Sequence, residues 1–390
     1  MERKHDVIVV GAGPAGAAAA AVLAQKGCDV LLLDRELFPR DKICGDAVPS
    51  GAIELLYRLG MKDKILAAQQ REEFYPLQKM RLISTRGYEV KATFKKGLAG
   101  ADSFVAPRKY LDAVIQQHAV DSGAEFRQAQ VKAPIIETDQ VVGVTAQTNG
   151  STHQFKADVV IGADGVTSAI ARALRPKSER HSDKHRAVAL RAYIDDLETL
   201  PHEIEFYLYR KILPGYAWIF PTGDQQANIG LGMRLDHFRA RKQDLNSMMR
   251  QFLAMSAVKK RLIHGGRLHD VATWQLNFGS QRNLQSAFAG AVLIGDAAGL
   301  VNPLTGGGIH NSLISAEIAA NIIFEALQVG DYSKERLQPY QAACHHALWK
   351  SMKRSYRLQS SLLRFPFLVD LLVNRMGTNS RLTQIFLSKL

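Results

Sequence analysis

The feature that most constrains this chain is a glycine-rich turn between a strand and a helix near its amino terminus. Residues 6–10 are a short β-branched run that ends at Gly11. An alanine-rich stretch continues to Gln25, and residues 28–34 form a second apolar run. Runs of this kind predict strands, and the alanine-rich stretch predicts a helix. We therefore expect the chain to open with a β-α-β unit.

The glycines of this turn, Gly11, Gly13 and Gly16, have the G-x-G-x-x-G spacing. In such a unit the first glycine makes the turn, the second lets the backbone approach a pyrophosphate, and the third packs helix on strand. The amino end of the helix offers N–H groups to the phosphates. Asp34 ends the second strand, where a carboxylate accepts hydrogen bonds from adenosine ribose hydroxyls. The combination predicts a dinucleotide site; the alternative is a tight turn without a ligand.

Two later strands also end in glycine and aspartate. Residues 157–165 close on Gly162-Ala163-Asp164-Gly165, and residues 291–296 close on Gly295-Asp296, ahead of an apolar helix predicted over 308–327. Between these strands, apolar and polar residues alternate in four segments, as they do in half-buried strands: 188–194, 203–210, 216–221 and 227–233. We predict that they form an antiparallel sheet in a second lobe inserted into the nucleotide-binding one.

The composition excludes several classes of protein. With 390 residues, of which 46 % are hydrophobic and 22 % charged, the chain can bury a sizeable core, which excludes disorder and fibrous repeats. Cys28, Cys44 and Cys344 lack disulfide or metal-ligand spacing, so no metal site is expected. No apolar signal core precedes Gly11, and glycines and a proline interrupt the uncharged segment 7–24, so no membrane span is predicted and a cytoplasmic location is expected.

The net charge of +13 is concentrated near the carboxyl end. Residues 333–390 hold ten Lys or Arg against two acids, a net +8. Leu348, Met352 and Tyr356 stand four apart among basic residues, and an apolar, hairpin-like stretch follows over 365–373. This pattern suits peripheral contact with an anionic membrane more than with nucleic acid, which we do not expect as a partner. The alternative is an ordinary packed helix with a solvated basic face.

Taken in order, the three glycine motifs resemble those of FAD-dependent oxidoreductases, a class that includes the aromatic hydroxylases. The resemblance implies that the segment around Asp164 supports the cofactor and that the carboxylate of Asp296 contacts the ribityl chain. It also places Arg108 near the cofactor, for which the alternative is a surface charge at a helix start. Hydroxylases usually carry histidine at the position of Gly299, and this chain does not.

Three segments make the chain similar to the geranylgeranyl reductase family in particular. Lys42-Ile43-Cys44-Gly45-Asp46 resembles the family's cysteine-glycine signature beside the flavin. Residues 214–221, with Tyr216 and Trp218, resemble its Tyr-x-Trp-x-Phe-Pro substrate motif; the alternative is a strand whose aromatic side chains fill a core. The third segment is 295–309.

Two positions depart from the family pattern as we expect it. Pro214 stands one residue closer to Tyr216 than the family spacing, and Gly307 stands where an acid is common. These departures leave the substrate open more than the cofactor.

The resemblance implies an α/β fold with a Rossmann-type FAD-binding domain, an inserted antiparallel-sheet substrate domain and a helical carboxyl-terminal tail. The expected boundaries are 1–75, 106–180 and 286–335 for the FAD-binding domain, 76–105 and 181–285 for the substrate domain, and 336–390 for the basic helical tail. The residues expected at the cofactor come from the motifs and their neighbours: Gly11, Gly13, Ala15, Gly16, Asp34, Arg35, Cys44, Gly45, Arg108, Asp164, Asp296, Gly308 and Ile309.

Family members use FAD to saturate carbon–carbon double bonds in isoprenoid chains. The resemblance therefore implies reduction of a geranylgeranyl-type chain of a lipid, pigment or quinone, with electrons from NADPH or ferredoxin. An isolated alkene has no carbonyl to stabilise charge, so hydride delivery needs nearly concerted protonation. Cys44 is the leading candidate beside the flavin, as proton donor or packing element; the alternative is a small buried hydrophobe.

Two other functions fit the same fold. A monooxygenase or halogenase would use reduced flavin with oxygen, and Gly299 and the missing first Trp of a Trp-x-Trp pair count against it. A prenyl-binding protein without activity would need no flavin, and the set Gly11, Asp34 and Asp296 disfavours it. The chain ends in Ser388-Lys389-Leu390, which matches a peroxisomal address but supports no prediction without a known eukaryotic source. The oligomeric state is left open.

Overall fold

The predicted β-α-β unit is present at the amino terminus. β1 (Lys4–Val10) pairs in parallel with β2 (Val30–Asp34), and α1 (Pro14–Gln25) connects them. Side chains of β1 alternate between two buried clusters, with Val7 and Val9 in one and Ile8 and Val10 in the other. Both faces of this strand are therefore covered, as in doubly wound α/β folds.

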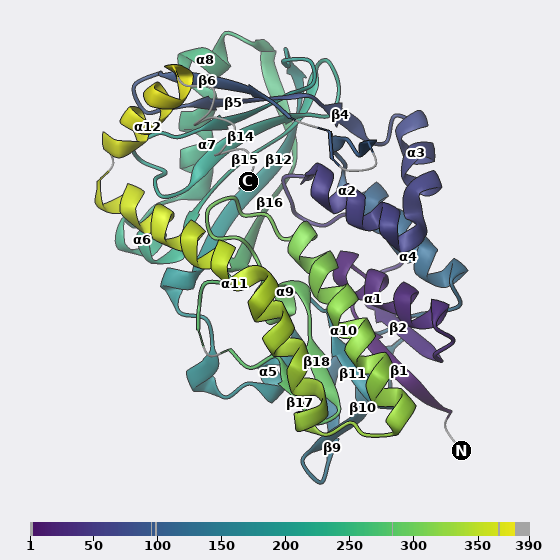
Figure 1. Cartoon of the computed structure of the whole chain (residues 1–390). Helices are drawn as coiled ribbons and strands as arrows, with labels where there is room; N and C mark the ends of the chain where they lie inside the picture. Colours follow the sequence, from purple (N-terminus) through teal and green to yellow (C-terminus); the bar gives the residue numbers. More distant parts are fainter. Residues whose placement is uncertain (1–2, 95, 98–99, 283, 366, 379–390) are drawn as a thin grey trace.

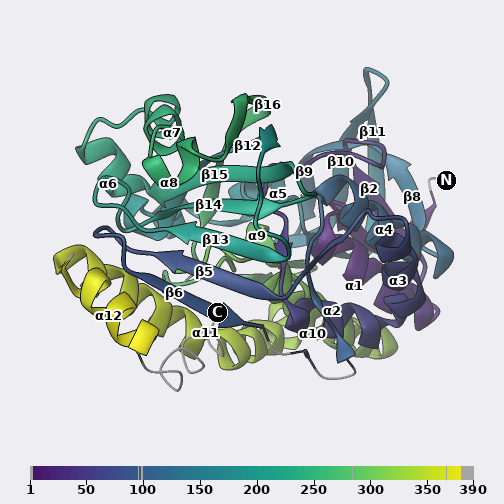
Figure 2. The same ribbon diagram turned by 90° about the horizontal axis from the view of Figure 1, so that it is seen from above.

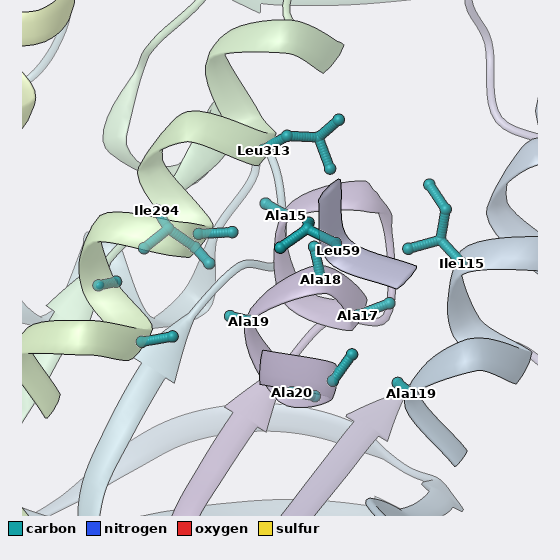
Figure 3. Close-up of a cluster of buried hydrophobic side chains, with 14 of the residues drawn as sticks. Ala15, Ala17, Ala18, Ala19, Ala20, Leu59, Ile115, Ala119, Ile294 and Leu313 are labelled. Carbon is teal, nitrogen blue, oxygen red and sulfur yellow. The ribbon is translucent and has the colours of Figure 1, made fainter. Parts of the chain in front are cut away.

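Alanine explains the close packing of α1. Ala17–Ala20 are fully buried and lie among Leu59, Ile115, Ile294 and Leu313, which come from other elements (Figure 3). Because alanine carries only a methyl group, the helix can approach its neighbours closely while still burying apolar surface. This packing fixes the amino end of α1, which bears the glycine turn.

The first lobe is built on an eight-stranded sheet in the order β17-β18-β11-β1-β2-β8, with β10 paired to β11 and β9 to β10. β18, β11, β1, β2 and β8 run parallel, whereas β17, β10 and β9 are antiparallel to their neighbours. The bounds are β8 (Glu125–Gln128), β9 (Gln130–Glu137), β10 (Gln140–Thr148), β11 (Ser151–Gly162), β17 (Ala287–Phe288) and β18 (Ala291–Leu293).

The second lobe is built on a seven-stranded sheet in the order β16-β12-β15-β14-β13-β5-β6. Neighbouring strands are antiparallel except for β5 and β13, which run parallel. All seven strands lie within 76–105 and 181–285: β5 (Lys79–Ile83), β6 (Glu89–Thr93), β12 (Arg186–Leu197), β13 (Glu203–Tyr207), β14 (Tyr216–Pro221), β15 (Gln226–Arg234) and β16 (Leu262–Asn277). The sequence analysis did not predict β16, whose residues are mostly exposed or half-buried.

Shorter elements complete the lobes (Figure 1). A three-stranded sheet has the order β3-β7-β4, with β3 (Ala47–Val48), β4 (Tyr75–Leu77) and β7 (Ser103–Val105). The helices of the first lobe are α2 (Ser50–Leu56), a π-helical turn (Tyr57–Met61), α3 (Lys62–Gln70), α4 (Arg108–Asp121), α5 (Ala169–Leu174), α9 (Gly295–Ala298) and α10 (Ile309–Val329). The second lobe carries α6 (Leu235–Ala240), α7 (Leu245–Leu253) and α8 (Ser256–Lys259), and two 3-10 turns, Lys177–Glu179 and Asp183–His185, precede it.

Within the described residues one helix, α10, is long and apolar enough to cross a membrane, a property that the sequence analysis overlooked. In the fold it packs against α1, with Leu313, Ala316, Ala320 and Ile323 fully buried. Its composition is therefore accounted for by its place in the core of the first lobe.

The long helix α11 (Lys334–Arg364) joins the two lobes. Its 31 residues span about 46 Å at 1.5 Å per residue. Near its start, Tyr340 donates a hydrogen bond of 2.7 Å to the Leu293 carbonyl in the first lobe. Further along, Tyr356 stacks on His185 with ring centroids 4.6 Å apart.

α12 (Phe367–Thr378) follows α11 and lies beside β6 (Figure 2). Asp370 attaches it there by accepting hydrogen bonds from the Thr85 hydroxyl and the Arg86 backbone N–H. The prediction of a hairpin-like stretch over 365–373 is wrong, because residues 367–373 are helical and turn Val369 and Val373 inward. The stripe of Leu348 and Met352 is also buried.

The structure is a computed structural model that describes residues 3–94, 96–97, 100–282, 284–365 and 367–378. The terminal Ser388-Lys389-Leu390 lies outside the described residues.

Candidate active site

A cavity of about 760 Å³ lies where the two lobes meet, at the carboxyl ends of β1 and β11. Open α/β sheets bind ligands at this edge. All three glycine motifs contribute to its lining, as do the Cys44 loop and β14. The predicted site residues that line it are Gly11, Gly13, Ala15, Asp34, Arg35, Cys44, Gly45, Arg108, Asp164, Tyr216, Trp218, Asp296, Gly308 and Ile309. Gly16 lies behind this surface.

The three glycines of the first turn do different things. Gly11 has φ +100°, and a Cβ atom there would lie 2.5 Å from the Ala163 carbonyl oxygen. At Gly16 a Cβ atom would lie 1.8 Å from the Gly11 carbonyl oxygen, so the third glycine allows the helix to close on the turn. At Gly13 the nearest atom is 3.7 Å away, on Arg40. The protein itself therefore leaves room at Gly13, as expected where a ligand approaches.

Asp34 already holds the glycine turn. Its carboxylate accepts hydrogen bonds from the Ala12 N–H at 2.7 Å and from the Glu36 N–H at 3.0 Å. Each carboxylate oxygen can accept more than one hydrogen bond, so a ribose contact fits this arrangement and stays a prediction. Arg35 is largely exposed beside it, near Glu36.

The second and third glycine motifs each place an aspartate, Asp164 and Asp296, in the lining of the cavity. One Asp164 oxygen accepts a hydrogen bond of 2.7 Å from the Ala169 N–H, and the other is buried with no partner among the described residues. Burial raises the pKa of Asp164. Asp296 lies beside the start of α10, because a Cβ atom at Gly308 would be 3.1 Å from its carboxylate.

Arg108 is buried and held by Asp112. Its guanidinium donates two hydrogen bonds of 2.6 and 2.7 Å to that carboxylate, which also accepts one of 2.6 Å from Arg40. Burial lowers the pKa of Arg108, but Asp112 outweighs this effect and holds the pKa above its ordinary value. Arg108 thus faces the cavity as a fixed cation, which excludes the surface-charge alternative.

A chain of hydrogen bonds connects Trp218 to the Cys44 loop. The Trp218 indole N–H donates to the Asn228 side-chain oxygen at 2.9 Å. The Asn228 amide then donates to the Cys44 carbonyl at 2.8 Å and to the Asp46 carboxylate at 2.7 Å. A Cβ atom at Gly45 would lie 3.1 Å from the Phe220 ring. The two family motifs therefore hold each other in place.

Asp46 is fully buried in this network and has φ +65°. The Tyr193 hydroxyl donates a hydrogen bond of 2.6 Å to the same oxygen that Asn228 contacts, and the other oxygen has no partner among the described residues. Burial raises the pKa of Asp46 to about 6, although these two hydrogen bonds act in the opposite direction. Behind it, the buried Arg191 binds Asp41 and stacks on the Tyr193 ring.

The aromatic residues of β14 form one wall of the cavity. Tyr216, Trp218 and Phe220 alternate along the strand and all line it. The Tyr216 hydroxyl donates to the Thr305 carbonyl, which ties β14 to the loop before α10. The wall continues with Leu276, Phe278, Val301 and Leu304, which make this branch of the cavity apolar.

Sequence reasoning missed Lys42, Asp46, Tyr193, Arg191, Asn228 and Trp274 as residues of the site. Lys42 and Asp46 stand in the recognised Cys44 segment, but nothing in the sequence distinguishes their roles. The other four come from β12, β15 and β16, and only the strand register brings them to the Cys44 loop.

The residues present fit FAD. The cavity is lined by both the glycine turn and the Cys44 loop, and the first turn of α1 contributes to its lining. One buried oxygen of Asp164 has no hydrogen-bond donor among the described residues, so a donor of the cofactor can bind there. Among the described residues no group of three His, Cys, Asp or Glu side chains is placed to hold a metal ion. The cavity and its lining define the class of the protein as an FAD-binding α/β protein.

The comparisons with known proteins agree with that class. The FAD binding domain family matches residues 4–355. A digeranylgeranylglycerophospholipid reductase from Methanocella arvoryzae is 32 % identical over 92 % of this chain and 87 % of its own length. The chain belongs to the geranylgeranyl reductase family of FAD-dependent oxidoreductases.

Solved structures show the same fold. A geranylgeranyl bacteriochlorophyll reductase-like protein from Thermoplasma acidophilum superposes with a TM-score of 0.86 at 25 % identity, over 97 % of this chain and 92 % of that one. A flavin-dependent brominase superposes with a TM-score of 0.74 at 19 % identity, over 99 % and 93 % of the two chains. The brominase shares the fold alone.

Proposed function

We propose that this protein reduces carbon–carbon double bonds in the isoprenoid chain of a lipid, with FAD as its cofactor. The observation that carries the proposal is the continuity of the cavity, which runs from the glycine turn past Cys44 to an apolar branch. A prenyl chain is uncharged and flexible, so such a branch can bind it by excluding water. The names of the related reductases support this class of substrate.

In the proposed reaction bound FAD, once reduced, would supply a hydride. The protein's residues then have three tasks: to bind the cofactor, to place the alkene against it and to keep water out. The glycine turn, Asp34, Arg108, Asp164, Asp296 and the start of α10 would hold FAD. Tyr216 and Trp218 would orient the prenyl chain. NADPH or ferredoxin would deliver the electrons.

Mass analysis of products tests the proposal directly. The protein would be reduced without oxygen and incubated with prenyl lipids that carry phosphate, glycerophosphate or quinone head groups. We expect a gain of two hydrogens per reduced bond. Products that form only with oxygen would favour a monooxygenase or halogenase, and a colourless protein that binds prenyl lipids without changing them would favour a binding protein.

The purified protein should be yellow, and Asp296→Ala should weaken its hold on FAD. Without the carboxylate, ribityl hydroxyls would lose an acceptor, at a cost of about 1–3 kcal/mol per unpaired group. We expect roughly tenfold or greater loss of affinity, measured by the flavin retained after dialysis. Asp296→Asn, which keeps an oxygen acceptor, should retain more. Full flavin occupancy in Asp296→Ala would remove the role assigned to this residue.

We also propose that the end of α11 contacts an anionic membrane. Lys350, Arg354, Arg357 and Arg364 are exposed and follow the helical spacing of a single face. In the segment that follows α11 and in α12, Phe365, Phe367 and Leu371 are 44 %, 61 % and 48 % exposed. Exposed cations beside exposed apolar side chains suit attachment to a lipid surface, from which a prenyl lipid would be collected.

Vesicle-binding measurements distinguish the contribution of the basic residues from that of the exposed apolar side chains. Arg354→Gln with Arg357→Gln should weaken binding to anionic vesicles at least about tenfold, since each basic residue contributes about 1 kcal/mol near such a surface. Wild-type binding should fall as salt rises, because exposed charges are screened over about 10 Å at 0.1 M. Phe367→Ser should reduce the binding that remains at high salt. Equal binding of all variants to anionic and neutral vesicles would contradict the proposal.

A further inference from the structure

Lys42 stands in the loop after β2, and its side chain lies against β16 of the substrate lobe. It lines the cavity together with Cys44 and Trp274. Its ammonium lies 3.9 Å from the centroid of the Trp274 ring. In the part of the chain that the structure describes, this ammonium has no hydrogen bond or ion pair. The face of the Trp274 ring is an attractive position for this cation.

The surroundings make this ammonium unusually acidic. Burial and, to a smaller extent, the Arg108 cation lower the pKa of Lys42 from 10.5 to about 8. The charges of Asp296 and Asp112 act in the opposite direction without restoring the ordinary value. Lys42 therefore carries its proton at neutral pH but can release it readily, which is the property of an effective general acid.

The other titratable groups near Lys42 are less suited to this task. Burial raises the pKa of the Cys44 thiol, so it stays protonated and is a weaker acid than the lysine. Asp46 is absent from the cavity lining, and its carboxylate is turned toward Tyr193 and Asn228. Arg108 is fixed in its charged form by Asp112.

We propose that Lys42 is the proton donor for alkene reduction. Its ammonium gives a proton to one alkene carbon, and the electrons of the broken N–H bond stay on nitrogen as the lone pair of a neutral amine. The alkene π electrons form the new C–H bond at that carbon. A hydride from the bound, reduced cofactor would form the C–H bond at the other carbon, and two electrons would thereby pass to the substrate. Water then returns a proton to the amine. The inference rests on the proposed function.

The test follows oxidation of the pre-reduced, FAD-loaded enzyme by a prenyl lipid as a function of pH. In the wild type the rate should fall as pH rises through about 8, where the ammonium is lost. Lys42→Arg keeps a cation over Trp274 but does not release its proton, and Lys42→Met removes the charge. Both variants should react roughly 100-fold more slowly, without that pH dependence, which is a typical loss for a missing general acid.

Three controls distinguish a proton donor from a binding residue. Flavin content and prenyl-lipid affinity should be close to wild type in Lys42→Arg. Lys26→Met, which removes a lysine that lies over the Phe324 ring outside the cavity, should leave rate and pH dependence unchanged. Cys44→Ala should keep the pH dependence even if its rate falls. Loss of FAD from both Lys42 variants would identify a cofactor ligand and overturn the proposal, as would a Cys44→Ala variant that alone loses the pH dependence.

A second measurement does not depend on turnover. Acylation of Lys42 in the holoenzyme, followed by peptide mass analysis, should titrate near pH 8, whereas an ordinary lysine titrates near 10.5. A midpoint near 10.5 would overturn the assignment of Lys42 even if the enzyme is active. A midpoint near 8 in a protein that reduces no prenyl lipid would instead overturn the proposed function.

Discussion

Gly16→Ala should yield a protein that holds no FAD and unfolds at a lower temperature. The added Cβ atom would lie 1.8 Å from the Gly11 carbonyl oxygen and 3.0 Å from the Ala163 Cβ atom. The first contact is with backbone, so the start of α1 has to move away from the turn. Overpacking of this kind costs about 1–3 kcal/mol or more, and the moved helix no longer presents its N–H groups to the pyrophosphate. Thermal unfolding and flavin content after purification measure both effects.

Gly13→Ala provides the matched comparison. A Cβ atom at that position has its nearest neighbour 3.7 Å away, so the fold should tolerate it. The methyl group would nevertheless stand where the pyrophosphate approaches, and we expect at least about a tenfold loss of FAD affinity. Added FAD should then raise the unfolding temperature of the wild type more than that of Gly13→Ala. Equal effects of the two substitutions on stability would contradict the different roles assigned to these glycines.

The second large effect is expected at Asp46 and depends on pH. Burial raises its pKa to about 6 in the native state, from 3.8 in the unfolded chain. Between these values the native state holds a proton that the unfolded state has released. The free energy of unfolding should therefore fall as pH rises through this window, by about 3 kcal/mol in all at 1.36 kcal/mol per pKa unit. The measurement is urea unfolding at a series of pH values.

Asp46→Asn and Asp46→Ala separate the charge from the hydrogen bonds. Asparagine tolerates positive φ and keeps an acceptor for Tyr193 and Asn228, so Asp46→Asn should gain stability over the wild type as pH rises. Alanine leaves both donors buried without an acceptor, and Asp46→Ala should lose about 3 kcal/mol or more at every pH. Parallel stability curves for the wild type and Asp46→Asn would show that this carboxyl does not titrate in the window.

The sequence predicted those parts of the fold whose signals are local. The strand, glycine turn and helix of residues 6–25 are contiguous, and the structure has them as β1 and α1. Strands β12, β13, β14 and β15 were also predicted, because their segments alternate between apolar and polar residues. β16 was missed because its buried contacts are few, and α12 was misread because an apolar run of that length does not distinguish helix from strand.

In the candidate site too, the residues that belong to a local motif were predicted and those brought together only by the fold were not. Residues within a motif, such as Gly11 or Cys44, are identified by their neighbours in the sequence. Asn228 and Tyr193 are ordinary strand residues until β12 and β15 pair in register and bring them to Asp46. Lys42 is a third case. The sequence places it in the Cys44 segment, but the low pKa of its ammonium arises from burial and from the nearby Arg108 cation, and no sequence pattern indicates either of these.

The hydrogen bonds of Asn228 have a consequence for protein engineering. They connect a loop of the first lobe to β15 of the second through the Cys44 carbonyl and the Asp46 carboxylate, and they connect β15 to the Trp218 indole of β14. A chimera that exchanges the substrate lobe for that of a relative, in order to change the chain length accepted, would separate these partners if the crossover points ignored them. A chimera should therefore take the loop over residues 42–46 from the same parent protein as strands β14 and β15.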